Sequence, residues 1–150
     1  MSNLDLLGRK ISNFDALIDV WIAKLGIGYN HYAVLYTLAD TTAQNLPCTQ
    51  KCISEGWLIP KQTVFNICKD YKEKGWLEFV ENPADKRERI LHLTESGKAQ
   101  ALPVWQASRE LGDSIFTRFG EEKTAQMFAL MDEFCEIGRL QIEQAQAEQE

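Results

Sequence analysis

The fold is decided by residues 76–98, WLEFVENPADKRERILHLTESGK. Two short apolar runs, Trp76–Val80 and Ile90–Leu93, stand on either side of a polar segment, Glu81–Glu88. Apolar runs of this length around turn-forming residues predict two strands joined as a β-hairpin with a long polar tip. Because a two-stranded hairpin is only marginally stable by itself, we expect it to pack against helices.

The chain upstream of this hairpin carries helical patterns. Apolar residues spaced by three and four predict helices over Asn13–Leu25 and Tyr29–Leu38, and a polar loop follows at Thr41–Pro47. Thr49 is expected to cap a short third helix that runs to about Glu55, because its hydroxyl can accept a hydrogen bond from an unpaired N–H of the first turn.

A fourth helix is expected between Pro60 and Gly75. Proline suits the first turn of a helix because its missing N–H costs nothing there, and glycine suits the left-handed residue that follows a helix. The spacing of apolar residues predicts the buried face of this helix, which consists of Val64, Ile67, Cys68 and Tyr71.

Two long helices are expected after the hairpin. Thr94 caps the first, which runs towards Phe119, and the second covers about Glu121–Gln144. Three short helices followed by a hairpin form a winged helix-turn-helix, in which the hairpin is the wing. We therefore predict a mainly α structure with a two-stranded β-hairpin wing, an α+β fold that forms one protomer over residues 1–150.

The wing carries a family pattern. Asp85-Lys86-Arg87, followed five residues later by Leu93-Thr94-Glu95-Ser96-Gly97, resembles the acidic-x-Arg and Leu-Thr-x-x-Gly motifs of the MarR family of bacterial transcription regulators. Residues 60–64 and 74–77 are similar to the start and the end of that family's recognition helix. The resemblance covers about residues 10–145, nearly the whole chain.

This resemblance implies a dimeric regulator of transcription, usually a repressor. A lobe of about residues 28–98 would bind double-stranded DNA, and helices within about residues 5–27 and 99–146 would form a homodimer. A two-fold dimer places two recognition helices roughly 34–36 Å apart, which predicts a near-palindromic operator. The chain departs from the family at Phe79, where an Arg often stands, so an ion pair from that strand cannot brace the wing.

The exposed side of the fourth helix is the predicted major-groove reader. Amide side chains offer both a donor and an acceptor to adenine, lysines can meet phosphate or guanine, and an aromatic ring can contact a thymine methyl group. A solvated helix face with no ligand is the plain alternative. The candidate residues are Lys61, Gln62, Thr63, Phe65, Asn66 and Lys69.

The wing tip is the predicted minor-groove contact. Arg87 or Arg89 can enter a narrow A·T segment, which attracts guanidinium groups. Asp85 would repel phosphate if it were free, so we expect it to orient Arg87, and Lys86 stands between the two. The alternative is an exposed turn of mixed charge, worth about 0–1 kcal/mol to stability.

Apolar stripes near both ends of the chain predict the dimer. They exceed what three small helices and a hairpin can cover, although packing within one protomer is the alternative. The stripes contain Phe14, Leu17 and Trp21 near the N-terminus and Phe128, Met131, Phe134, Cys135 and Ile142 near the C-terminus.

Release from DNA has two candidate triggers. The resemblance implies a small, commonly aromatic ligand held between the dimer region and the DNA-binding lobe, where polar-tipped aromatic residues suit a largely apolar pocket, although such residues are more often plain core. The other trigger is oxidation of Cys48, whose pKa a helix N-terminus would lower, or of Cys68 on the recognition helix, against the commoner inert thiol. The candidate pocket residues are Trp21, Tyr29, His31, Tyr32 and Tyr36.

Composition restricts the class of protein. Apolar residues make up 45% of the chain and charged residues 25%, as in soluble globular proteins. There is no apolar run of membrane-spanning length and no secretory pattern at the N-terminus, so a cytoplasmic location is expected. The cysteines are expected to be reduced, and neither a metal nor a cofactor is expected, because nothing near Cys48 and Cys52 completes a ligand set.

The charge is unevenly distributed. The net charge is −6, but residues 59–98 hold 8 basic and 7 acidic residues, whereas residues 99–150 hold 4 and 10. The acidity therefore lies at the C-terminal end, and the middle of the chain permits a local surface that faces DNA.

Two other functions remain open. The acidic total and Phe79 slightly favour a winged-helix module that binds proteins and not DNA. An enzyme that uses Cys48 or Cys52 with His31 is the other alternative, but neither thiol stands in an evident arrangement with a base and an orienting group.

Overall fold

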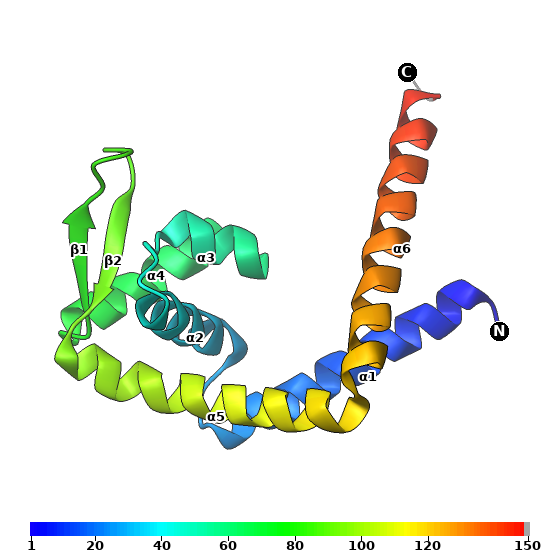
Figure 1. The fold of residues 1–150 in the computed structure, drawn as a ribbon. Helices are drawn as coiled ribbons and strands as arrows, with labels where there is room; N and C mark the ends of the chain where they lie inside the picture. The colour runs from blue at the N-terminus through cyan, green and yellow to red at the C-terminus, as the bar shows by residue number, and fades with distance from the viewer. Residues whose placement is uncertain (149–150) are drawn as a thin grey trace. The chain divides into compact units, whose positions relative to one another are not determined.

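The computed structural model describes residues 1–148 and divides into two compact units, Met1–Ala107 and a second unit that begins at Ser108. The predicted mainly α fold with a hairpin wing is confirmed (Figure 1). The elements are α1 (Asn3–Lys24), α2 (Tyr29–Ala43), α3 (Gln50–Trp57), α4 (Lys61–Glu73), β1 (Leu77–Glu81), β2 (Arg89–Leu93), α5 (Glu95–Phe119) and α6 (Glu121–Ala147).

Helix α1 begins ten residues before the predicted start at Asn13, which was wrong. Ser2 caps it with a capping box: its hydroxyl accepts a hydrogen bond from the Asp5 N–H, and the Asp5 carboxylate accepts one from the Ser2 N–H. Two unpaired donors of the first turn are satisfied in this way. Residues 3–12 therefore belong to a helix that is already capped at its start.

Helix α2 is also longer than predicted. It runs through Ala43, where a loop was expected. Thr41 and Thr42 direct their hydroxyls back to backbone oxygens of the preceding turn, including that of Leu38, at 2.6–3.2 Å. This back-bonding lets threonine stay in a helix and explains why a polar run did not end it.

The helix-turn-helix consists of α3 and α4. Thr49 caps α3 as predicted, since its hydroxyl accepts a hydrogen bond from the Cys52 N–H at 3.1 Å. Helix α3 runs past the predicted end at about Glu55 to Trp57, and the next residue, Leu58, has a left-handed backbone with φ 52°. Ser54 is buried and donates to the Ile59 oxygen at 2.6 Å, which fixes the turn that leads into α4.

The wing is an antiparallel pair in which Leu77 faces Leu93 and Glu81 faces Arg89. A third stretch of chain ties it to the helix-turn-helix. The Leu91 N–H donates to the Cys48 oxygen at 2.8 Å, next to a bridge between Thr49 and Ile90. The base of the wing is thus hydrogen-bonded to the segment that starts α3.

The core of the first unit lies under the wing and α4. All four residues predicted for the buried face of α4 are buried, and they pack with Leu77 and Leu91 of the wing and with α2. Gly75 has φ 75°, which confirms the expected left-handed position after α4. No helix among residues 1–148 is both long and apolar enough to cross a lipid bilayer.

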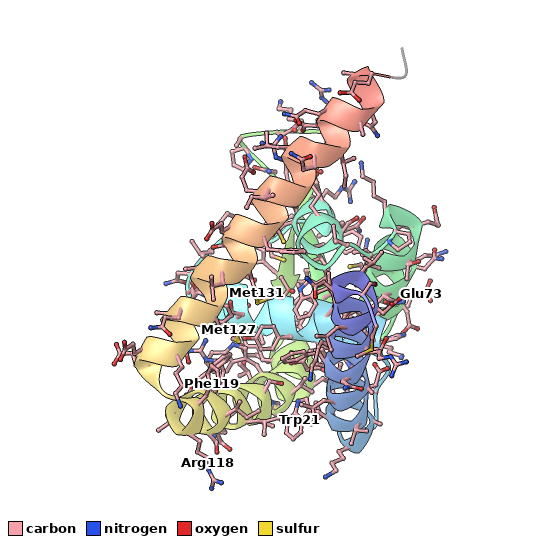
Figure 2. The ribbon with its side chains drawn as sticks, turned by 90° about the vertical axis from the view of Figure 1, so that its right-hand side faces the viewer. Trp21, Glu73, Arg118, Phe119, Met127 and Met131 are labelled. Atoms are coloured by element: carbon pink, nitrogen blue, oxygen red, sulfur yellow. The ribbon has the colours of Figure 1, made fainter. Side chains whose placement is uncertain are left out.

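The second unit holds the end of α5 and all of α6. None of the described residues of α6 is buried, and Figure 2 shows Met127 and Met131 one turn apart along it. Phe116 and Phe128 have ring centroids 5.8 Å apart. Large apolar side chains remain exposed in this unit, namely Ile115, Phe116, Phe119, Phe128, Leu130, Met131, Phe134, Ile137, Leu140 and Ile142.

Candidate nucleic-acid interface

Helix α4 presents the predicted reading residues on the side opposite its buried face. Lys61, Gln62, Phe65, Asn66 and Lys69 are exposed, and Thr63 is partly buried. The Phe65 side chain keeps 46% of its surface exposed, which is unusual for a phenylalanine with a core beside it. This face offers amides, cations and an aromatic ring together, as a major-groove reader requires.

Two of the amides are already coupled. Gln62 Nε2 donates to Asn66 Oδ1 at 2.9 Å, one turn along α4. The bond leaves Gln62 Oε1 as an acceptor and the N–H groups of Asn66 Nδ2 as donors. Adenine presents a donor and an acceptor in the major groove, so the pair is complementary to its edge.

The wing tip is organised by short side-chain hydrogen bonds. The Ala84 N–H donates to Asn82 Oδ1 and the Arg87 N–H donates to Asp85 Oδ1, both at 3.0 Å. The expected contact between Asp85 and Arg87 is present, with Arg87 Nε 3.9 Å from Asp85 Oδ1. Because the Arg87 side chain is 95% exposed, its guanidinium remains open to a ligand while the carboxylate limits where it points.

A cleft of about 410 Å³ separates the wing from α4. Three cations, one carboxylate and two aromatic rings line it, so the lining carries a net positive charge beside apolar surface. Its lining residues are Gln50, Phe65, Lys72, Phe79, Arg87, Glu88 and Arg89.

Sequence reasoning missed three residues of this surface. Gln50 and Lys51 begin α3 and line a smaller hollow with Lys61 and Glu88, and Lys72 lies at the cleft. Lys72 falls outside the first turns of α4, where base contacts were sought. Gln50 and Lys51 follow a recognisable cap at Thr49, and that signal could have found them.

The junction of the wing with α5 is closed by Thr94. Its hydroxyl donates to the Gly75 oxygen at 2.6 Å and accepts from the Gly97 N–H at 3.0 Å, while its own N–H donates to the Trp76 oxygen at 3.0 Å. The predicted cap is confirmed, and it also ties the end of α4 to the wing. A Cβ at Gly97 would lie 1.9 Å from the Trp76 oxygen, so only glycine fits there.

Comparison with solved structures decides the family. The chain is 40% identical to a MarR family regulator from Neisseria meningitidis, with 96% of this chain and 99% of that one covered and a TM-score of 0.83. The MarR family model matches residues 25–88. The chain belongs to the MarR family.

More distant MarR-like structures show the same fold. The MepR–DNA complex of S. aureus is 20% identical, covers 91% of this chain and 98% of its own, and has a TM-score of 0.63. The heme sensor protein PefR from Streptococcus agalactiae is 17% identical, with 89% and 92% covered and a TM-score of 0.55. Comparison with curated proteins gave no match.

In this MarR family member the aromatic residues predicted to line one ligand pocket are divided. Tyr29, Tyr32 and Tyr36 pack around Trp57, each with ring centroids 6.0–6.1 Å from it. Trp57 in turn donates through Nε1 to Thr37 Oγ1 at 2.7 Å. These tyrosines thus join α2 to α3.

Trp21 and His31 stand apart from that cluster. Trp21 Nε1 is buried and finds no acceptor within residues 1–148 (Figure 2). His31 Nδ1 is 2.8 Å from the Tyr71 hydroxyl. His31 and Tyr71 line a cavity of about 390 Å³ with Leu25, Ile27, Leu35, Lys74, Trp76, Ala99, Gln100, Pro103 and Val104.

The cysteines do not behave as the redox hypothesis expects. Cys48 and Cys68 are 2% and 0% exposed, and burial raises the pKa of both thiols to about 12. The expected lowering of the Cys48 pKa by a helix N-terminus is therefore wrong, because burial disfavours the charged thiolate. No cluster of three or more metal-ligating side chains occurs within residues 1–148.

We predict that thiol reagents distinguish these cysteines. At pH 7 to 8 the native protein should react rapidly at Cys52, which is exposed, and at least about 100-fold more slowly at Cys48 and Cys68, because the thiolate is the reacting form. Mass spectrometry of timed alkylation measures this. Since the folded-state pKa is raised, both thiols favour the fold at low pH, and this contribution is lost as pH rises above the ordinary thiol pKa. Rapid native labelling of Cys48 would revive the redox hypothesis.

Proposed function

We propose that this MarR family protein is a sequence-specific, double-stranded DNA-binding transcriptional regulator that acts as a repressor. The observation that carries the proposal is the pairing of an exposed reading face on α4 with an exposed Arg87 on the wing, on either side of one cationic cleft. Helix α4 enters the major groove and the wing enters the adjacent minor groove. The solved MepR–DNA complex shows that a protein of this fold binds DNA.

The regulator acts as a homodimer on a palindromic operator. The support is the number of large apolar side chains left exposed on α1, α6 and the end of α5, which include Phe14, Leu17, Phe128, Met131 and Phe134. Such patches on a protein of this size mark an association surface. A two-fold dimer repeats the reading face at a distance set by the turn of DNA, which requires an operator with matching symmetry.

A small, largely apolar ligand releases the dimer from DNA. The cavity beside His31 supports this part, because about 390 Å³ suits a small molecule and His31, Lys74 and Gln100 supply a few polar groups. Tyr71 of α4 and Trp76 at the start of the wing form part of its wall. A ligand there would push on the elements that read DNA.

The second candidate is a winged-helix module that binds proteins, favoured by the net charge of −6. Salt dependence separates the two functions, because phosphate contacts release counterions. We expect affinity for a pool of random duplexes to fall by about 10³-fold between about 50 and 200 mM salt in fluorescence anisotropy. Lys69→Met should reduce the slope of log affinity against log salt concentration by about one unit. Lys123→Met should leave that slope unchanged. Absent or salt-insensitive DNA binding would favour the protein-binding module.

A further inference from the structure

The inner face of the wing changes character along its length. Alternate residues of a strand share a face, so Leu77, Phe79 and Glu81 lie on one side of β1. Their partners on β2 are Leu93, Leu91 and Arg89. The face is apolar at its base, where Leu77 and Leu91 are buried, and charged at its tip. Phe79 stands at the boundary, partly buried against the core.

Lys72 of α4 lies over this boundary residue. Its ammonium is 4.9 Å from the centroid of the Phe79 ring, within the range of a cation–π contact. Its neighbour Lys74 forms an ion pair with Asp70 at 2.8 Å and lies over the rings of Tyr71 and Trp76. The contact joins α4 to the wing at a point between the core and the cleft, where both residues line the wall.

A contact at this point affects the direction in which the tip of the wing points. The wing is fixed at its base by the Thr94 junction and along β2 by the bond from Leu91 to Cys48 and the bridge between Ile90 and Thr49. A hairpin held along one strand can still rotate about that strand, and a small rotation displaces Arg87 at the tip. The Lys72–Phe79 contact joins the other strand, β1, to α4.

We propose that Phe79 is a positioning residue for DNA reading: through its ring contact with Lys72 it fixes the angle between the wing and α4, and so determines which base pairs Arg87 and Arg89 reach. The ring holds the lysine by its quadrupole, which requires no second charge on the strand. Phe79 stands where the MarR family often has an arginine, and the ring contact needs no charge at that position. The inference rests on the proposed function.

A double-mutant cycle tests it, with Phe79→Leu, Lys72→Met and the double variant measured on a selected operator. Phe79→Leu keeps a smaller apolar side chain at a partly buried position, and Lys72 is exposed, so both variants should fold. We expect each single change to weaken binding about five-fold and the double change no more than about ten-fold, because both remove the same contact. A double effect of about 25-fold, the product of two independent losses, would overturn the proposal.

Two further readouts separate positioning from a structural role. Phe79→Leu should reduce the preference for A·T over G·C at the base pairs under the wing without changing the salt slope. Its NMR spectrum should also lose the upfield ring-current shift of the Lys72 ε-methylene protons. If Phe79→Leu lowers thermal stability alone and leaves affinity and base preference intact, Phe79 is only a core residue and the proposal fails.

Phe65→Leu is the matched control. Phe65 lines the same cleft from α4, so its loss can weaken binding, but its effect should multiply independently with that of Lys72→Met. Failure of the wild-type protein to bind any DNA would refute the proposed function. The NMR shift of the Lys72 protons would still report on the Lys72–Phe79 contact. If the wild-type protein binds DNA but the Phe79 and Lys72 substitutions act independently, this inference alone is refuted.

Discussion

Replacing Gly97 with alanine should destabilise the fold more than any other single methyl group added to a helix of this chain. The new Cβ would lie 1.9 Å from the Trp76 carbonyl oxygen, 2.8 Å from its carbonyl carbon and 3.1 Å from Leu93 Cδ2. The first two atoms are backbone, so no rotamer relieves the clash. Helix α5 must move away from the wing, which would break the Thr94 bonds to Gly75 and Trp76.

We expect Gly97→Ala to lower the free energy of unfolding by about 3 kcal/mol and the melting temperature by about 10 °C. The matched control is Gly56→Ala, since Gly56 is also helical and has nothing within 4 Å of an added Cβ. That variant should gain about 0.5–1 kcal/mol, because alanine loses less backbone entropy on folding. Thermal unfolding followed by circular dichroism measures both, and equal melting temperatures would show that the junction is not as tight as the structure has it.

Removing the Arg87 side chain should cause the largest loss of DNA affinity from a single wing substitution. The guanidinium is 95% exposed and only loosely paired with Asp85, so it contributes little to the free energy of unfolding. In the proposed function, its contribution is a contact with a narrow minor groove. Without it, Asp85 remains at the tip as an unopposed negative charge near phosphate.

We expect Arg87→Ala to weaken operator binding by about 10- to 100-fold while the melting temperature stays unchanged. Arg118→Ala is the control, because it removes the same charge from the last turn of α5, outside the wing and α4 (Figure 2). Titrations at one fixed salt concentration compare the two. An Arg87→Ala affinity equal to that of Arg118→Ala would mean that the wing does not enter DNA.

The sequence predicted best where a local rule governs the chain. Val64, Ile67 and Tyr71 recur at helical spacing, and all are buried. Thr49 and Thr94 carry hydroxyls at helix starts, and both act as caps. These features depend on residues three or four apart, so neighbours in the sequence suffice to predict them.

The sequence did not predict features that depend on distant residues meeting or on one rule competing with another. The three predicted pocket tyrosines pack on Trp57, which lies at least 21 positions later in the chain, and no periodicity on α2 indicates that partner. Burial of Cys48 overrides the helix terminus that was expected to activate it. Lys72 approaches Phe79 only because the wing folds back on α4.

In the candidate site, too, local contacts were predictable from the sequence and contacts between distant residues were not. Arg87 and its contact with Asp85 were predictable, because the two residues belong to one turn. The cleft between α4 and the wing was not, because it is formed by residues from α3, α4 and both strands. Phe65 was placed on the exposed side by helical spacing, but its share in the cleft depends on the angle of the wing.

Selection of bound duplexes from a random pool, at one fixed salt concentration, tests the central claim most directly. A homodimer that reads DNA with α4 and the wing should enrich a near-palindrome whose half-sites are centred about one helical turn apart, with A·T pairs where the wing lies. Arg87→Ala should relax the preference at those A·T pairs and retain the half-sites read by α4. A pool that shows no enriched sequence, or a single site without two-fold symmetry, would contradict the account.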